Sequence, residues 1–353
     1  METTPPLFAP ITVPDEQAGQ AVRETLAGAA TPGASLGRLG EVAAWVAACQ
    51  GATPPAPLRR PRVVVFAGDH GVAKRGISAL DPSSSVHQAA DIAAGGGAVN
   101  VFARAAGASV RLVDVSLDHD VAGEERVSRS CGAIDVEDAM TRGELDRALA
   151  IGKAVADQEI DAGADLLVPG DLGVGNTTVA AAVIGSFTRT EPVAVIGPGS
   201  GITDEVWKVK VSALRDAMFR ARSMTGRPLE VLQTISSPDF AALVAFIAQA
   251  AVRRTPVLLD GAPVTAAAYV AEKLAPGARA WFAAGQLTPE PAHLIALQAL
   301  ELTPLLALDM RVGQGTGALA ALPLLSVAVE LVADEFAARA EERAQSGSHR
   351  YEG

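Results

Sequence analysis

A glycine-rich segment at residues 166–179 combines a turn with side chains that suit an anion. It reads Leu-Leu-Val-Pro-Gly-Asp-Leu-Gly-Val-Gly-Asn-Thr-Thr-Val, an apolar run, a turn and the start of an alanine-rich stretch. Gly173 and Gly175 permit a tight turn and a close approach of the backbone to a ligand. Three residues suited to the start of a helix follow, namely Asn176, Thr177 and Thr178. The P-loop lysine and the dinucleotide-fingerprint spacing are both missing. We interpret the segment as strand, phosphate-binding loop and helix; a turn without a ligand is the alternative.

Three further glycine loops follow apolar runs that have the character of strands. They span residues 66–72, 196–201 and 310–317, and the second supplies Gly199, Ser200 and Gly201. Loops at the carboxyl ends of parallel strands are where an open α/β sheet binds its ligand. The sequence therefore predicts a small anionic ligand held by several loops rich in backbone donors.

Carboxylates stand in or beside these loops. Asp69 and His70 form the strongest pair, for which an Asx turn with a capping His is the alternative. Asp171 lies just before the first glycine turn and is either a ligand contact or a helix-approach cap. Asp260 follows an apolar run and precedes Gly261, which favours a ligand contact over a solvated surface charge.

A lysine and a second polar turn complete the candidate residues. Lys210 is predicted near the start of a helix at residues 204–223, where its ammonium group can meet a phosphate; an exposed helix lysine is the alternative. Glu290 and His293 belong to a turn that is a candidate part of the site; a capped helix start is the alternative. No spacing of His, Asp or Glu indicates a metal site, and no cofactor is predicted.

Strands and helices alternate about six times without a repeat of fixed length. Strands are predicted at residues 62–66, 109–115, from 166 onward, 193–196, 256–259, 279–283 and 304–308. A polar stretch at residues 116–140 has no clear period and is predicted to be a surface excursion. This alternation predicts an α/β fold with a doubly wound, mostly parallel sheet and helices added at both chain ends.

The composition of the 353 residues narrows the class of protein. With 49% hydrophobic but only 4% aromatic residues, the core must be built from Ala, Val, Leu and Ile, which suits helices packed on a parallel sheet. A net charge of -11 argues against nucleic-acid or anionic-membrane partners. Two cysteines are too few for a disulfide framework. The first residues lack a signal-peptide pattern and no apolar run reaches transmembrane length, so a soluble cytoplasmic protein is predicted.

Taken together and in this order, these residues resemble the nicotinate-nucleotide:dimethylbenzimidazole phosphoribosyltransferase family, which makes the α-ribazole phosphate of cobalamin's lower ligand. The resemblance covers roughly residues 30–338 and is too long for a coincidence of short motifs. The segments that carry it are residues 35–39, 67–72, 170–178, 253–256, 259–261 and 310–318.

The resemblance implies a homodimer with a Rossmann-like large domain at residues 61–317 and a small helical domain made of residues 1–60 and 318–353. It implies that nicotinate mononucleotide binds at Asp171, Gly173, Gly175, Asn176, Thr177, Thr178, Gly199, Ser200, Gly201, Lys210, Asp260, Gly261, Thr288 and Glu290. The heterocyclic acceptor is expected near Ser78, Gln88, Met310 and Val312, and His70 is a further predicted substrate contact.

The donor chemistry sets what the site must do. Nicotinate leaves from a cationic pyridinium as a neutral ring, so the site must stabilise an oxocarbenium-like sugar and deprotonate the incoming azole. The family's base is a glutamate in Gly-Glu-Gly-Thr-Gly, and this chain has Gln314 there. An amide cannot accept that proton at neutral pH. The candidate catalytic residues are Gln314, Asp69 and Asp171, with deprotonation assigned to another group such as Asp69 or to water.

Departures from the family pattern cluster in the acceptor half, whereas the phosphate-binding half is nearly intact. The sequence therefore predicts phosphoribosyl transfer from a pyridinium mononucleotide to a nitrogen heterocycle. Two alternatives stay open: cleavage of the N-ribosidic bond with water or another acceptor, and a non-catalytic homologue that binds the nucleotide.

Overall fold

The computed structural model describes residues 6–29 and 33–348 and contains a parallel five-stranded sheet. The strands are β1 (Pro61–Gly68), β2 (Ser109–Ser116), β3 (Leu166–Leu172), β4 (Val257–Leu259) and β5 (Phe282–Ala284). Their order in the sheet is β2-β1-β3-β4-β5, and each neighbouring pair is parallel. The predicted α/β fold with a parallel sheet is confirmed.

The direction in which strands are added reverses between β1 and β3. From β1 the chain first builds outward to β2 and then returns to the other side with β3, β4 and β5. Loops that leave neighbouring strands in opposite directions open a crevice at their carboxyl ends, which is where doubly wound sheets bind ligands. The loops after β1 and β3 are therefore the first place to look for a site.

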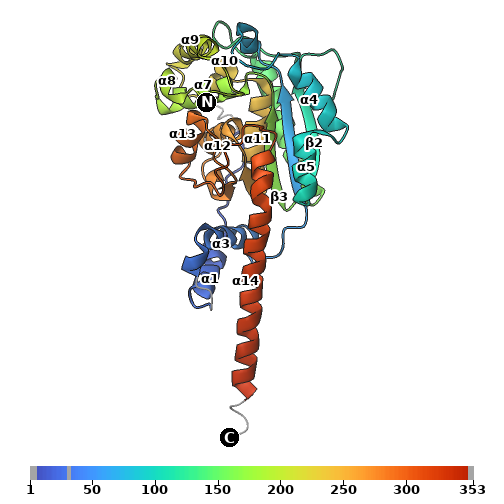
Figure 1. Cartoon of the computed structure of the whole chain (residues 1–353), viewed down its shortest axis with the longest axis vertical. Coiled ribbons are helices and arrows are strands. Elements are labelled where there is room, and N and C mark those ends of the chain that lie inside the picture. The colour runs from blue at the N-terminus through green and yellow to red at the C-terminus, as the bar shows by residue number, and fades with distance from the viewer. Residues whose placement is uncertain (1–5, 30–32, 349–353) are drawn as a thin grey trace. The chain divides into compact units, whose positions relative to one another are not determined.

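Helices alternate with the strands along the chain and are added before the first strand and after the last (Figure 1). They are α1 (Glu16–Ala27), α2 (Gly33–Leu36), α3 (Arg38–Gln50), η1 (Gly71–Arg75), α4 (Ser84–Ala93), α5 (Gly97–Ala105), α6 (Arg142–Asp161), α7 (Asn176–Thr188), α8 (Pro192–Val195), α9 (Asp204–Ala221), α10 (Pro228–Ile235), α11 (Pro238–Val252), α12 (Ala262–Leu274), η2 (Ala278–Trp281), α13 (Pro291–Ala299) and α14 (Thr316–Ser348). Helices α4 and α5 pack beside β2, whereas α7, α12 and α13 pack on one another.

The core is built from small and branched aliphatic side chains. Strand β3 is buried at every position, as expected for a central strand covered on both faces. Helix α11 is buried from Pro238 to Ala251 and packs against α6 and the first three strands. A helix that is apolar all round is stable only inside such a core.

Two predicted strands are wrong. Residues 193–196 fall largely in α8, a four-residue helix that begins with a proline, which is favoured at the first position of a helix. Residues 304–308 form only an isolated bridge, Gln286 to Leu306. Both runs are short, and short apolar runs do not distinguish strand from other buried structure. The loop at residues 196–201 therefore follows a helix rather than a strand.

By its internal contacts the chain divides into two compact units. The larger contains the residues up to Thr12 and Arg60–Ala320, and the smaller contains Val13–Arg59 and the residues from Ala321 onward. The larger unit holds the whole sheet. The predicted domain boundaries, near residues 60 and 318, remain a proposal.

Part of α14 is long and apolar enough, by length and composition, to cross a membrane. This part runs from Thr316 to Glu342, and 56% of its most apolar window is buried inside the protein. Core helices of soluble proteins meet the same criterion, so it is weak evidence for a membrane span. The prediction that no apolar segment reaches this length is nevertheless wrong. The first five residues, on which the signal-peptide argument partly rested, lie outside the described residues.

Candidate active site

Asp171 lies at the carboxyl end of β3 and faces a pocket. The residue is 4% exposed, and its Oδ2 accepts a hydrogen bond from the side-chain amide of Asn176. Its Oδ1 has no hydrogen-bond partner among the described residues. Burial, and next the negative charge of Asp260, raise the pKa of Asp171 to about 7. A carboxyl group with this pKa takes up and releases protons near neutral pH.

The glycine turn after β3 places the start of α7 at the same pocket. Gly175 is the residue before α7 and has a φ of 102°, in the left-handed region that favours glycine. Thr177 and Thr178 follow in the first turn, and both line the pocket. The hydroxyl of Thr178 is buried and has no partner within the described part of the chain. This turn and Asp171 therefore each contribute a buried polar atom without a partner among the described residues to the lining of one pocket.

A buried lysine stands across the same turn. Lys210, on α9, is 1% exposed, and its Nζ donates to Thr177 Oγ1 at 3.0 Å and to the carbonyl of Gly197 at 3.4 Å. Burial lowers the pKa of Lys210, an effect that the carboxylate of Glu290 opposes. Glu290 also accepts from the amide of Gly199 at 2.7 Å. Glu290 therefore places a carboxylate on the predicted anion-binding loop, close to the ammonium group of Lys210.

His293 fixes the turn that carries Thr288 and Glu290. The amide of Thr288 donates to His293 Nδ1 at 3.1 Å, so the opposite nitrogen, Nε2, carries the proton and donates to Thr265 Oγ1 at 3.0 Å. Burial lowers the pKa of His293 to about 4, so the ring is neutral at physiological pH. Its role is to hold Thr288 at the pocket wall.

Gln314, which the resemblance predicts to stand at the base position, contacts a pocket residue. Its φ is 62°, a left-handed conformation that is uncommon for glutamine. Its Nε2 donates to the Oε1 of Gln88 at 2.9 Å. A Cβ atom at Gly170 would lie 2.5 Å from the carbonyl carbon of Gln314, so this loop packs directly on β3 because Gly170 has no side chain. Gln88 lines the pocket and Gln314 does not.

The carboxylate of Asp260, just after β4, is fully hydrogen-bonded within the protein. Its Oδ1 accepts from the amides of Gly317 and Ala318, at 3.0 and 3.2 Å, and from Gln286 Nε2 at 2.8 Å. Its Oδ2 accepts from the amide of Gly315 at 2.9 Å. These amides belong to the start of α14, so Asp260 binds a helix N-terminus, where a negative charge is favoured.

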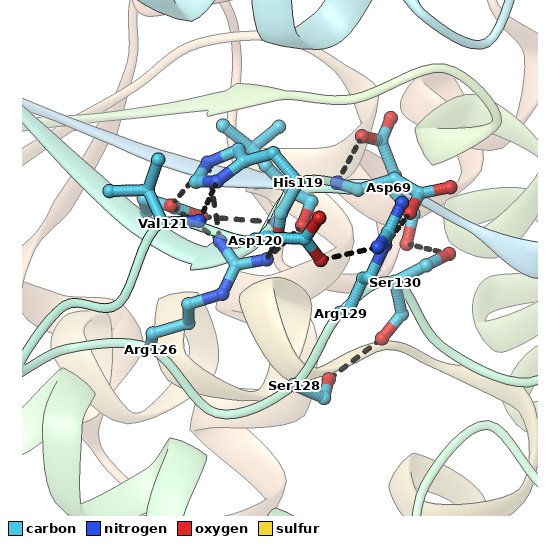
Figure 2. A network of polar contacts seen from close by, with 11 residues as sticks. Asp69, His119, Asp120, Val121, Arg126, Ser128, Arg129 and Ser130 are labelled. Carbon is cyan, nitrogen blue, oxygen red and sulfur yellow. Dashed lines mark hydrogen bonds and ion pairs between the residues drawn. The ribbon is translucent and has the colours of Figure 1, made fainter.

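Asp69 and His70 lie after β1, beside a second cavity that Lys74 and His87 also line. The side chain of Asp69 accepts from the amide of Asp118 at 2.8 Å, and its carbonyl accepts from Ser130 Oγ at 3.1 Å. Figure 2 shows this contact as part of a network after β2. In the same network, Arg129 pairs with Asp118 and Asp120. Asp69 is thus held by the predicted surface excursion and does not line the first pocket.

The first pocket brings together most of the predicted binding residues. Those that line it are Ser78, Gln88, Asp171, Gly173, Gly175, Asn176, Thr177, Thr178, Gly199, Ser200, Lys210, Gly261, Thr288, Glu290 and Val312. Those that do not line it are Asp69, His70, Gly201, Asp260, Met310 and Gln314. The side chains of Asp260 and Gln314 are used within the protein, and the neighbours of Gly201 and Met310 line the pocket in their place.

Sequence reasoning missed several pocket residues, notably Ser85 and Arg311. Ser85 precedes Gln88 by three residues on α4, so both lie on the same helix face, a spacing that a search for helical periodicity can find. Arg311 stands between Met310 and Val312 and lines the pocket. The positive charge of Arg311 in a glycine loop was a signal for a site residue that the sequence prediction did not include.

Two kinds of chemistry line the pocket. A buried ammonium and threonine hydroxyls suit an anionic ligand. Asp171 adds a carboxyl group that has one oxygen without a partner among the described residues and a pKa of about 7. In the described ranges no group of three or more His, Cys, Asp or Glu residues is placed to hold a metal ion. The arrangement suits binding of an anion and proton transfer to or from a second ligand.

Known proteins match this chain over most of its length. A family model described as a phosphoribosyltransferase matches residues 11–341. The nicotinate-nucleotide–dimethylbenzimidazole phosphoribosyltransferase of Corynebacterium efficiens is 61% identical over 328 residues, which cover 93% of this chain and 89% of that protein. The enzyme of that name from Mycobacterium avium is 51% identical over 326 residues, which cover 91% of this chain and 93% of that one. The crystal structure of the Thermus thermophilus protein of that name has a TM-score of 0.84 and 36% identity, with 90% of this chain and 96% of that chain covered.

Proposed function

The chain belongs to the nicotinate-nucleotide–dimethylbenzimidazole phosphoribosyltransferase family, and we propose that it transfers the 5-phosphoribosyl group of nicotinate mononucleotide to 5,6-dimethylbenzimidazole with Asp171 as the proton acceptor. The observation that carries the proton-acceptor assignment is the carboxyl group of Asp171. Asp171 lines the pocket, one of its oxygens is buried without a hydrogen-bond partner among the described residues, and its pKa is about 7.

The donor half of the site suits an anionic nucleotide. Lys210 supplies a buried positive charge, and Thr178 supplies a hydroxyl with no partner in the described structure. Glu290 now occupies the amide of Gly199, so a phosphate that approaches this loop must displace or share that contact. We assign the phosphate to Lys210 and the start of α7, since both lie on one wall of the pocket.

The transfer breaks one bond to the anomeric carbon of the ribose and forms another. The C–N bond to the pyridinium breaks, and its electron pair returns to nicotinate, which leaves as a neutral ring. One ring nitrogen of the benzimidazole then donates its lone pair to that carbon. The other ring nitrogen becomes acidic as the ring gains positive charge, and its proton passes to Asp171 Oδ1. Nicotinate, the ribotide and a protonated Asp171 result, and Asp171 returns the proton to solvent.

Neither of the other two candidate proton acceptors, Gln314 and Asp69, is as well placed as Asp171. Gln314 has an amide in place of a carboxylate, and its side chain hydrogen-bonds Gln88. Asp69 lies beside the second cavity. We therefore propose that Gln314 orients Gln88, and through it the acceptor ring, without accepting the proton.

We also propose a cytoplasmic homodimer. Helix α14 exposes Leu324, Val327 and Leu331 at spacings of three and four residues, which form an apolar stripe along one helix face. A stripe of this kind along one exposed helix face suits a second copy of the chain. Light scattering after gel filtration tests the dimer, and a monomeric mass at micromolar concentration would contradict it.

The test of function is incubation of the purified protein with nicotinate mononucleotide, with and without 5,6-dimethylbenzimidazole. Chromatography with mass spectrometry follows nicotinate and ribosylated products. We expect nicotinate release that depends on the azole and yields its ribotide in equal amount. Release without the azole, with free ribose 5-phosphate, would instead indicate hydrolysis, and binding without release would indicate a non-catalytic homologue.

A further inference from the structure

The backbone N–H and C=O of Val174, in the middle of the glycine turn, are hydrogen-bonded to side chains from two different elements. Its amide donates to Ser85 Oγ, on α4, at 3.0 Å. Its carbonyl lies 2.9 Å from His70 Nδ1, which donates to it. The turn that shapes the donor wall of the pocket is therefore fixed between the acceptor-side helix and a histidine that lies outside the pocket.

His70 is in contact with this turn as well as hydrogen-bonded to it. A Cβ atom at Gly173 would lie 2.7 Å from His70 Cε1, and one at Gly175 would lie 3.2 Å from His70 Cβ. The two glycines thus allow the turn to lie directly on the imidazole. Any residue that leaves the ring position empty removes the surface on which the turn rests.

The opposite ring nitrogen of His70 meets a buried carboxylate. His70 Nε2 lies 3.2 Å from Ser237 Oγ and 3.4 Å from Asp239 Oδ2, and both His70 and Asp239 are buried. Since Nδ1 donates to a carbonyl, which has no proton to give, an Nε2 that also donates to Asp239 makes the ring an imidazolium. Asp239 holds the pKa of His70 above its ordinary value although burial alone would lower it, and His70 keeps the pKa of Asp239 low.

We propose that His70 is a positioning residue for the transfer reaction: its Nδ1–H fixes the Val174 carbonyl and thereby the glycine turn, and its buried positive charge acts on Asp171. This rests on the proposed function, since Asp171 is assigned there as the proton acceptor. The donor role and the charge role have separate consequences, because one acts through a single hydrogen bond and the other through the field in a buried site.

Several other charged groups surround His70 and Asp171, and any pH dependence includes them. Within the described structure the carboxylates that act on the two residues are Asp69 after β1, Asp239 on α11 and Asp260 after β4. Lys74 on η1, His87 on α4 and Asp118 after β2 line the second cavity with His70. Among these charges only that of His70 lowers the pKa of Asp171, while Asp260 and Asp239 raise it.

Two amide variants separate the roles. In His70→Asn the side-chain NH2 falls near the position of Nδ1 and keeps the donor to Val174, whereas in His70→Gln it falls near Nε2 and that donor is lost. Both variants remove the charge. We expect the KM for nicotinate mononucleotide to rise about 3- to 10-fold in His70→Gln, as for loss of one hydrogen bond, and to stay within about 3-fold in His70→Asn.

The acid limb of the pH–rate profile reports the charge role. With the imidazolium gone the pKa of Asp171 is higher, so the limb should move upward in both variants. The ionisation of the azole itself is the same with every enzyme, so only the difference between enzymes is interpreted. Asp146→Asn, at a half-exposed carboxylate on α6 that lines neither cavity, is the control and should change neither quantity.

Measurements without turnover keep the test independent of the proposed function and of variant folding. Hydrogen exchange of residues 173–177 should be faster in His70→Gln than in His70→Asn, and nitrogen NMR of histidine-labelled wild type should show both His70 nitrogens protonated at pH 7. A neutral His70 ring, or equal exchange and equal KM in the two variants, would overturn the proposal. If wild type shows the protonated ring but transfers nothing to the azole, the proposed function fails and the support of the turn by His70 stands.

Discussion

The carboxyl ends of β3 and β4 carry buried aspartates in similar local sequence but in opposite hydrogen-bonding states. Asp171 and Asp260 each end an apolar strand and precede a glycine by one or two residues. Asp260 accepts four hydrogen bonds, three of them from amides at the start of α14. Asp171 accepts one, from Asn176, and its Oδ1 has no partner among the described residues.

The comparison shows that the surroundings decide what a strand-end aspartate does. A helix N-terminus supplies donors and positive potential, which satisfy a carboxylate and make it structural. Burial raises the pKa of both carboxyl groups, but four donors oppose the shift at Asp260, whereas at Asp171 the side-chain amide of Asn176 is the one donor in the described structure. The negative charge of Asp260 also raises the pKa of Asp171, so the structural residue tunes the functional one.

The largest expected effect is loss of transfer in Asp171→Asn. An amide cannot accept the azole proton, and removal of a positioned general base typically lowers the rate by about 10² to 10⁴-fold. Chromatographic assay of azole ribotide measures it. Asp146→Asn, at a half-exposed carboxylate on α6, is the control and should leave the rate unchanged. A variant that keeps more than about a tenth of the wild-type rate would show that proton transfer does not depend on Asp171.

Asp260→Ala should instead cost stability. It leaves the amides of Gly315, Gly317 and Ala318 and the side-chain amide of Gln286 without their acceptor in a buried place. We expect the free energy of unfolding to fall by about 3 to 5 kcal/mol, as when one partner of a buried charged group is removed. Urea unfolding measures it, with Asp171→Asn as the matched variant at the neighbouring strand. Equal losses in the two variants would contradict the contrast between the strand ends.

The same two strand ends show how much of the site the sequence alone predicts. Apolar runs followed by glycine and aspartate located both ends, and the glycine turn predicted Thr177 and Thr178 at the pocket. The pattern did not separate Asp171 from Asp260, because the donors that satisfy Asp260 come from the distant start of α14. A contact between residues far apart in the chain leaves no local signal.

The other differences between the sequence prediction and the structure also come from contacts between residues far apart in the chain. Asp69 and His70 were placed at the ligand because they end β1, yet His70 supports the glycine turn from outside the pocket. The loop at residues 196–201 was placed after a strand that is in fact the short helix α8, and Gly199 and Ser200 still line the pocket. The resemblance drew attention to Gln314, whereas its hydrogen bond to Gln88 required the fold.

The stability of the protein should depend on pH in a way that Asp171→Asn removes. The pKa of Asp171 rises from 3.8 to about 7 on folding, so between these values the native state holds a proton that the unfolded state has lost. Stability from this group is therefore present at low pH, falls as pH rises toward 7 and levels off above it. The shift corresponds to a difference on the order of 4 kcal/mol. We expect the free energy of unfolding of Asp171→Asn, relative to wild type, to increase between pH 5 and pH 8 in urea titrations; a constant difference would mean an ordinary pKa.

The smallest expected effect is that of Gln314→Glu, and it tests whether Asp171 or position 314 holds the base. A glutamate there lies beside Gln88, which must turn its amide to donate to the new carboxylate. Because we propose that Asp171 is the proton acceptor, we expect the transfer rate to change by less than about tenfold. The new negative charge should move the acid limb of the pH–rate profile upward, since like charges raise each other's pKa. A gain of a hundredfold or more would mean that wild type lacks an effective base, which would leave Asp171 as a buried carboxyl group without the proposed role.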